Sequence, residues 1–497
     1  MAGKMIEPRS PCVIGVAQRT VRPEEGDAPE PLDLWEEVCR SAAVDSGGGD
    51  VLAAVDSLQV VYSLSWQYDD PPARLAARLG LRDGARHYTG LSGTAPQKRL
   101  ESAAAEILAG RSDVAVAVGA ESLATKRRLK KSGAKPAWSF RPEEKPALPF
   151  DDPFHPAEIA HQVFQAYLTF AVFDIARRAH LGLSPDEHRR RLGARLAPMS
   201  HIAAANPYAW LRNERTAEEL VEVTSRNRMV AYPYPKHTVS ILDVDMAAAV
   251  ILASHEKADA LGVARDRRVY LRGWCHAKDP VYVAERDELW RSVAMEEASG
   301  AALAGVGVGI DDMAHLDLYS CFGSSIEFAA DALGLAVEDS RPLSVTGGLP
   351  FHGGPGNNYT THAVATLVQK LREDASALGM VSGVGMHMTH HAFAIYSAEP
   401  GRVVPPDAAA VQARVEASPN RKIRNTAVGA ARVAAYSVVH SREGPVWGLA
   451  VCDMPAGDRC YARVDDPRLM QAMEEIEWVG REVRLVDAGS GVNRIEA

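Results

Sequence analysis

The chain alternates short apolar runs with amphipathic segments of helix length, and this alternation constrains its fold more than any other feature. Runs rich in Val and Ala, such as 12–17 and 114–118, have the length of buried strands. The segments between such runs, for example 32–43, are long enough for helices that cover a sheet. Because strands that alternate with helices are typical of largely parallel sheets, the pattern predicts an α/β fold.

A second series of alternating elements follows the first and extends to residue 397. Together the two series predict strands at 12–17, 57–62, 114–118, 237–242, 246–252, 269–274, 315–319, 380–384 and 392–397. They predict helices at 32–43, 71–81, 96–109, 285–303, 324–333 and 360–372. Two successive series of the same kind indicate an internal duplication.

Two further regions differ in character from these series. From Ser122 to about Val239, a basic run and several prolines precede long charged helical stretches, which is typical of an insertion. Glu399, Pro400, Gly401 and the prolines at 405 and 406 indicate a linker. Beyond the linker, we expect a small β-barrel with strands at 431–439, 446–452, 460–464 and 481–486 and a helix at 467–476.

Charge and cysteine content limit the partners and the compartment. The chain has 55 Lys and Arg against 64 Asp and Glu, a formal net charge of −9, so nucleic acid is a disfavoured partner. In residues 401–497 acidic and basic residues are equal in number, which makes the predicted barrel a poor platform for a phosphate backbone. The six cysteines lack paired spacing and no run of 18 apolar residues occurs, so we expect a cytoplasmic protein without disulfides or membrane contact.

Four loops either follow a predicted buried strand or open a predicted helix, which is where open α/β sheets build their sites. The first is SGTAPQ at 92–97, and the second is DLYSCFGSS at 317–325. The third is TGGLPFHGGPGNNY at 346–359, and the fourth is SGVGMHMTHH at 382–391.

In this order and spacing, the four loops resemble the catalytic loops of the thiolase superfamily. The similarity extends over about residues 10–398, with further matches at Asp245–Ala249 and at Asn206 and Pro207, the latter typical of the sterol-carrier branch. Within the superfamily, the chain resembles cysteine-less thiolase-like proteins of type 1. The segment from about Asn425 resembles the OB-fold partners of thiolase-like retro-aldolases, here fused into one chain.

The resemblance implies a duplicated thiolase fold, with βαβαβαββ twice in five layers, α-β-α-β-α, an inserted loop domain and a small C-terminal OB-like β-barrel. The expected N-terminal half comprises residues 1–121 and 236–262, and the inserted loop domain comprises 122–235. The C-terminal half then covers 263–398, the linker 399–424 and the barrel 425–497.

Against the thiolase pattern, the polar catalytic positions are replaced. The nucleophilic cysteine falls on Gly93, the histidine of the third loop on Gly354, and the second cysteine on Ser382. Thioester exchange needs a soft nucleophile beside a base, and the Claisen reaction needs a second acid/base group. We therefore do not expect Cys-dependent thiolysis or condensation.

The retained glycine-rich backbone still suits a thioester ligand, because its N–H groups can form an oxyanion hole. The resemblance implies coenzyme A or an acyl-CoA as ligand, with no other cofactor required. The expected binding residues are Gly93, Thr94, Gly353, Gly354, Gly383, Lys126, Arg127 and Arg128. The last three belong to a basic run that alternatively forms only a solvated loop.

Three titratable residues are candidates for chemistry that needs no nucleophile. Tyr319, His352 and Tyr359 would serve retro-aldol cleavage of β-hydroxyacyl-CoA, which needs a base and a stabilised enolate. Each tyrosine is equally well explained as a packed aromatic residue. Three functions therefore stay open: an acyltransferase-like acyl-CoA enzyme of lipid metabolism, a carbon–carbon lyase, and a catalytically silent CoA-binding protein.

Several other groups have structural explanations. Cys321 is better explained as a buried thiol than as a nucleophile. His387, His390 and His391 have no carboxylates in the same segment, so we expect no metal site. Arg189, Arg190, Arg191 and Arg195 fit an exposed helix face. The oligomeric state is expected to be a monomer or a homodimer.

Overall fold

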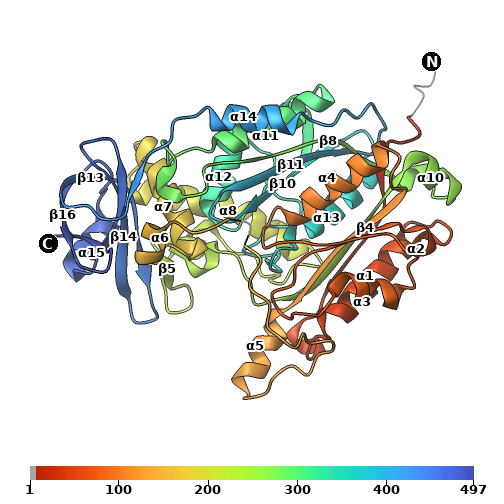
Figure 1. Ribbon diagram of the computed structural model, residues 1–497, viewed down its shortest axis with the longest axis horizontal. Helices are drawn as coiled ribbons and strands as arrows, with labels where there is room; N and C mark the ends of the chain where they lie inside the picture. Colours follow the sequence, from red (N-terminus) through yellow and green to blue (C-terminus); the bar gives the residue numbers. More distant parts are fainter. Residues whose placement is uncertain (1–6, 151, 337–338, 497) are drawn as a thin grey trace.

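The computed structural model describes residues 7–150, 152–336 and 339–496 (Figure 1). A nine-stranded sheet runs through the molecule in the order β3-β2-β4-β7-β1-β8-β11-β10-β9. Its first half contains β1 Pro11–Thr20, α1 Pro31–Asp45, α2 Val51–Ala54, β2 Ser57–Val60, α3 Pro71–Leu79, β3 Ala85–Tyr88, α4 Ala95–Leu108, β4 Val114–Ser122, β7 Asp245–Ser254 and α10 His255–Ala260. Its second half contains β8 Val269–Lys278, α11 Val293–Val306, β9 Met313–Asp317, α12 Gly323–Ala332, α13 Tyr359–Glu373, β10 Leu378–Gly385 and β11 His390–Ser397.

The two halves repeat one pattern of strand pairing, which confirms the duplication. In the first half β2 is parallel to β4, β4 is antiparallel to β7, and β7 is antiparallel to β1. In the second half β9 is parallel to β10, β10 is antiparallel to β11, and β11 is antiparallel to β8. The second half has no counterpart of β3 among the described residues, and the segment 339–346 takes that place without forming a strand.

The helices arrange the two half-sheets into the five expected layers. α1 and α3 cover the outer face of the first half-sheet, and α11 packs on the outer face of the second, next to α12. α4 and α13 lie between the half-sheets, because each of them contacts strands of both halves. The half-sheets join where Cys12 pairs with Tyr270 and Val13 with Val269.

The insertion is mostly helical, and the C-terminal region closes into a barrel. The insertion contains α5 Leu123–Lys131, α6 Pro156–Ala160, α7 Ala166–His180, α8 Pro185–Ala205, α9 Ala217–Val221, β5 Met229–Ala231 and β6 Tyr234–Pro235. The C-terminal region contains α14 Ala408–Glu416, β12 Ile423–Arg424, β13 Gly429–His440, β14 Pro445–Asp453, β15 Arg459–Val464, α15 Pro467–Glu475, β16 Glu482–Asp487 and β17 Asn493–Ile495. Pairing runs β13-β14-β15-β17-β16 and back to β13, which closes a five-stranded barrel of the expected OB-like kind.

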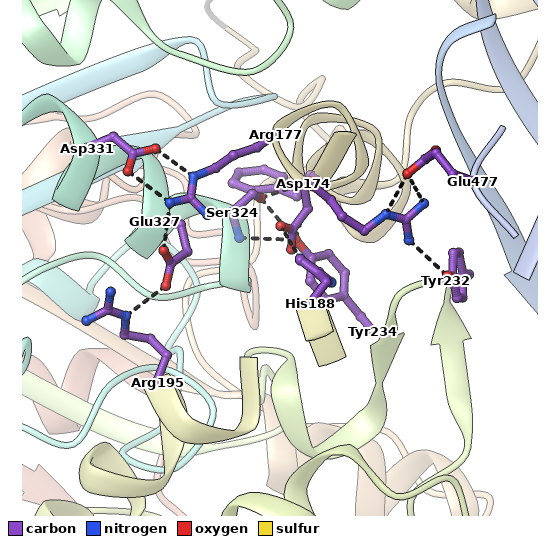
Figure 2. Close-up of polar contacts among 12 residues, drawn as sticks. Asp174, Arg177, His188, Arg195, Tyr232, Tyr234, Ser324, Glu327, Asp331 and Glu477 are labelled. Atoms are coloured by element: carbon purple, nitrogen blue, oxygen red, sulfur yellow. Dashed lines mark hydrogen bonds and ion pairs between the residues drawn. The ribbon is translucent and has the colours of Figure 1, made fainter. Parts of the chain in front are cut away.

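Helix α7 connects the insertion to the barrel and to α12 of the C-terminal half through buried polar side chains (Figure 2). Arg178, fully buried, donates to the hydroxyls of Tyr232 and Tyr436 and to Glu477 of the barrel. Arg177, the preceding residue of α7, donates to Asp331 of α12 at 2.6 and 2.9 Å. The barrel is therefore attached to the rest of the chain by charge-assisted hydrogen bonds, which are stronger than neutral ones.

The structure differs from several sequence predictions. The strand predicted at 237–242 is wrong, since only a 3-10 turn at Lys236–Thr238 forms and residues 239–242 belong to neither sheet of the described ranges. The basic run lies on α5 and not on a loop. The predicted linker 399–424 contains α14, whose buried Val411 and Val415 belong to the main apolar core and whose N-cap is Asp407. The helix predicted at 285–303 starts later, at Val293, because Ser292 caps it.

Within the described residues, no helix is both long and apolar enough to span a bilayer.

Candidate functional site

The four loops meet where the two central helices begin. Thr94 precedes the first turn of α4, and Asn358 precedes the first turn of α13. The Thr360 hydroxyl donates to the carbonyl of Gly93 at 3.1 Å, which joins the first loop to the first turn of α13, directly after the third loop. The fourth loop contacts the first, because Gly383 packs against Thr94. The structure thus brings these loops together around Gly93.

The space beside Gly93 is filled by Tyr319 from the second loop. A Cβ atom at residue 93 would collide with the Tyr319 hydroxyl and with the carbonyl of Val384, and would lie 2.8 Å from Cζ of Tyr319. Tyr319 is held in this position by its N–H, which donates to the Ser382 hydroxyl at 2.9 Å. The side chain that a nucleophile would need at residue 93 therefore has no room, and glycine is a steric requirement here.

Tyr359 lies next to Tyr319 and is tied to a buried carboxylate. The two rings are 5.5 Å apart in an edge-to-face arrangement. The Tyr359 hydroxyl donates to Asp317 at 2.8 Å and contacts the Thr346 hydroxyl at 2.7 Å. Burial, together with the charge of Asp317, raises the pKa of Tyr359 well above its usual value. Tyr359 is therefore a neutral hydrogen-bond donor at any physiological pH.

His352 is fully buried beside Tyr359. Its Nδ1 accepts a hydrogen bond of 3.3 Å from the Asn206 side chain, which leaves the proton on Nε2. Nε2 has no hydrogen-bond partner among the described residues. Burial lowers the pKa of His352 to about 3, so the ring is neutral and a weak base. His362, 5.2 Å away between ring centroids, also has an unpartnered Nε2.

The replaced histidine position, Gly354, is also closely packed. A Cβ at Gly354 would collide with the Ser240 hydroxyl, so a side chain at residue 354 requires Ser240 to move. The N–H of Gly354 donates to the carbonyl of Ile241 at 2.8 Å, so it is already occupied and cannot polarise a thioester. Gly353 has a φ of 111°, a conformation that favours glycine, and packs against Met246.

A large open cleft lies on one side of the third loop, and we call it the basic cleft. It has a volume of about 1270 Å³ and is lined by the insertion, by Pro350 and Phe351, and by the β13–β14 turn of the barrel. Its charged lining residues are Arg127, Arg215, Arg226, Arg228, Lys236, Arg442, Asp243, Glu443 and Glu474. Six cations against three anions give a local excess of three positive charges, on a chain whose net charge is −9.

Three of the six cations of the basic cleft are exposed and available to a ligand. Arg127 pairs with Asp243, and Glu474 is hydrogen-bonded to His440. Arg226, Lys236 and Arg442 are exposed, and no ion pair involves any of them among the described residues. The cleft can therefore bind a ligand with several negative charges, and such binding would be steered by the field of the cleft.

The structure separates the three basic residues predicted to bind CoA phosphates. Only Arg127 lines the basic cleft. Arg128 donates to Asp27 at 3.1 Å and lies 3.5 Å from Asp245, and Lys126 donates to the carbonyl of Leu64. Sequence reasoning missed Arg226 and Arg442, which lie far apart in the chain and carry no motif.

The residues given structural explanations are engaged in contacts of their own. Cys321 is hydrogen-bonded to Ser325, and burial raises the pKa of its thiol to about 12, so it is not a thiolate. His390 pairs with Asp152 and His391 with Asp279. In the described ranges no set of three His, Cys, Asp or Glu side chains is placed to hold a metal ion. Arg189 pairs with Asp186 on the surface, whereas Arg195 is largely buried against Glu327.

Comparisons with known proteins point to one superfamily. No family model matches the sequence. A solved structure, the monomeric SCP2-thiolase like protein type 1 from Mycobacterium smegmatis, is 30% identical with a TM-score of 0.87, covering 99% of this chain and all of that one. The Ltp2-ChsH2(DUF35) aldolase is 16% identical with a TM-score of 0.59, over 78% of this chain and 98% of that one.

A curated relative matches over a shorter stretch. Benzoylsuccinyl-CoA thiolase subunit BbsB from Thauera aromatica is 28% identical over 152 residues, which is 31% of this chain. The match spans 37% of that relative's length.

Proposed function

The chain belongs to the thiolase superfamily, and we propose that it binds CoA thioesters in the basic cleft without covalent acyl transfer. The observation that carries this proposal is the local excess of three positive charges beside the third loop. CoA has a phosphate-rich end and a neutral pantetheine arm. A ligand of this kind suits a cleft whose lining combines cations with the apolar side chains of Trp210, Ile241 and Phe351.

The packing around Gly93 supports the absence of acyl transfer. An acyl group can be transferred only to a nucleophile, and Tyr319 fills the volume where its side chain would stand. The six free cysteines do not replace it, since five are buried and the sixth, Cys321, is protonated at neutral pH.

The same packing favours binding over retro-aldol cleavage. A retro-aldol reaction needs a base for the β-hydroxyl, and proton transfer is efficient when the pKa of the base lies near the working pH. Burial lowers the pKa of His352 to about 3, and the hydroxyl of Tyr359 already donates to Asp317. Neither group is matched to the task in this conformation.

Calorimetry tests the binding proposal. CoA is titrated into the wild type and into Arg226→Ala/Arg442→Ala, with Arg189→Ala as a control on an exposed helix face outside the cleft. We expect micromolar binding that weakens at least tenfold in the double variant and with added salt, and that is unchanged in the control. Pantetheine, which lacks the phosphates of CoA, should bind much more weakly. Absence of heat with CoA would refute the proposal.

An assay of turnover separates the alternatives. We expect no thiolysis of acetoacetyl-CoA and no release of aldehyde or ketone from a β-hydroxyacyl-CoA. If the wild type releases an aldehyde or ketone, and His352→Gln abolishes this release without changing the affinity for CoA, the protein is a lyase. That result would contradict the silent-binding proposal.

A further inference from the structure

A second cavity lies behind the candidate site, and we call it the rear pocket. It has a volume of about 490 Å³ and lies between the C-terminal end of α8, the outer edge of β9 and the exposed side of α13. β9 is the last strand of the sheet among the described residues, and the segment beyond it, which includes Ser344 and Val345, forms no strand and also lines the pocket. The rear pocket shares no lining residue with the basic cleft.

Two chain segments form the partition between the rear pocket and the basic cleft. Asn206 and Tyr208 line the pocket, whereas Trp210 and Leu211 line the cleft. In the second segment, Ser344 and Val345, which directly precede the third loop, line the pocket, whereas Pro350 and Phe351 of that loop line the cleft. The segments are joined by backbone hydrogen bonds, Trp210 N–H to His352 and Leu211 N–H to Phe351. His352 therefore lies within this partition.

Three hydrogen-bonded connections run from the wall of the rear pocket to the buried site. Asn206 donates to Nδ1 of His352 at 3.3 Å. The Ser344 hydroxyl donates to Asp317 at 2.8 Å, and Asp317 in turn accepts from Tyr359.

The third connection begins at Thr366 and ends at the other buried histidine. The Gln18 amide donates to the Thr366 hydroxyl at 3.0 Å, and its oxygen accepts from Nδ1 of His362 at 2.9 Å. Because Thr366 accepts from Gln18, its own hydroxyl hydrogen is free for an acceptor in the pocket. Thr366 is 9% exposed and lines the pocket.

The charges of the lining residues determine which kind of ligand the rear pocket can bind. Lys370 and Glu373 lie 3.4 Å apart and cancel, and apart from His201 and His315 the lining has no other acidic or basic side chain. Much of the remaining wall is apolar, including Ile202, Ala205, Pro207 and Leu316. The volume lies within the range of small-molecule sites.

We propose that the rear pocket binds a neutral organic compound through a carbonyl or hydroxyl oxygen that accepts a hydrogen bond from Thr366. The bound oxygen would polarise the hydrogen bonds that link Thr366 through Gln18 to His362. This second ligand does not depend on CoA in the basic cleft, and its binding is tested separately.

Ligand-observed NMR with three probes of one size tests the proposal. Cyclohexanone supplies the neutral carbonyl, and cyclohexanecarboxylate and cyclohexylammonium are its charged counterparts. We expect saturable binding of cyclohexanone, with Kd at least tenfold lower than for either charged probe. Equal binding of the three, or none, would overturn the proposal.

Variants locate the bound probe. Ala205→Trp places a large side chain on the exposed rim of the pocket, and Thr366→Val removes the hydroxyl while keeping the shape. Each should weaken cyclohexanone binding at least tenfold, whereas Ala194→Trp, exposed on the same helix outside the pocket, should not. A wild-type affinity in both pocket variants would refute the site.

A spectroscopic readout tests the connection to the buried histidine. Cyclohexanone should shift the imidazole ¹⁵N resonances of His362 in the wild type. The same probe at saturating concentration should leave them unmoved in Thr366→Val. An unmoved His362 signal in the saturated wild type would contradict the hydrogen-bonded contact with Thr366.

Discussion

At the scale of single residues, the site is defined by side chains that replace catalytic groups and by the space they occupy. Sequence comparison identified Gly93, Gly354 and Ser382 as replacements, because each falls at a fixed place in an ordered set of loops. It did not reveal that Tyr319 fills the space beside Gly93 or that Ser240 fills the space beside Gly354. Such contacts join residues far apart in the chain, and no local pattern encodes them.

Gly93→Ala tests the steric account of the first loop. The added methyl group collides with Tyr319 and with the carbonyl of Val384, and overpacking of this kind costs about 1–3 kcal/mol. We expect a lower thermal midpoint, with part of the loss recovered when Tyr319→Ala is added. Gly300→Ala is the matched control, since its Cβ meets nothing within 4 Å and should be neutral or stabilising. Equal midpoints for wild type and Gly93→Ala would disprove the steric account.

Because His352 is buried in its neutral form, the stability of the protein should decrease at acidic pH. Burial lowers its pKa to about 3, whereas an unfolded histidine titrates near 6.5, so the unfolded state binds more protons between these values. Stability contributed by the neutral ring is complete above about pH 6.5 and is lost as pH falls towards 3, by roughly 1.4 kcal/mol per unit. Urea unfolding should show that the free energy of unfolding falls between pH 7 and pH 5 by about 2 kcal/mol more in the wild type than in His352→Gln. Equal losses of the free energy of unfolding in the two proteins would contradict the low pKa of His352.

At the scale of elements, apolar periodicity predicted most strands and helices of the two halves, because buried strands and covering helices leave strong patterns. It failed where burial is weak. β3 was missed because three of its four residues are exposed. α14 was missed because prolines and glycine precede it, although its apolar side packs into the core. The candidate strand at 237–242 had the right composition but no partner strand.

Asp317 should be essential for the segment that replaces the missing strand. Its buried carboxylate accepts hydrogen bonds from Ser344, Val345, Thr346 and Tyr359. Asp317→Asn sets an amide group against these donors and should cost about 2–4 kcal/mol. Hydrogen exchange at the N–H groups of Val345 and Thr346 should accelerate, with little change in the barrel. Asp311→Asn, with a fully exposed side chain, is the control. Unchanged exchange would show that Asp317 does not hold the segment.

At the scale of the whole molecule, the order of motifs predicted two halves, an insertion and a barrel. It could not predict how the barrel attaches, since that depends on side chains such as Arg178 that carry no motif. The barrel does more than extend the chain. Its β13–β14 turn forms one wall of the basic cleft and contributes Arg442. The ligand site that we propose thus exists only when insertion and barrel are held together.

Arg178→Met tests this attachment. Removing one partner of a buried charged cluster typically costs 3–5 kcal/mol, because the remaining polar groups are left unpaired. We expect a lower thermal midpoint, faster hydrogen exchange across β13, and weaker CoA binding. Arg189→Met on the exposed face of α8 should behave like wild type. If Arg178→Met binds CoA with native affinity, the barrel does not need this anchor to form the cleft.

The most direct test of binding without covalent transfer is a crystal structure of the protein soaked with acetyl-CoA. The account predicts the phosphates of CoA in the basic cleft near Arg226 and Arg442, with the thioester bond intact and every protein side chain unmodified. CoA bound elsewhere, or an acetyl group attached to the protein, would contradict it.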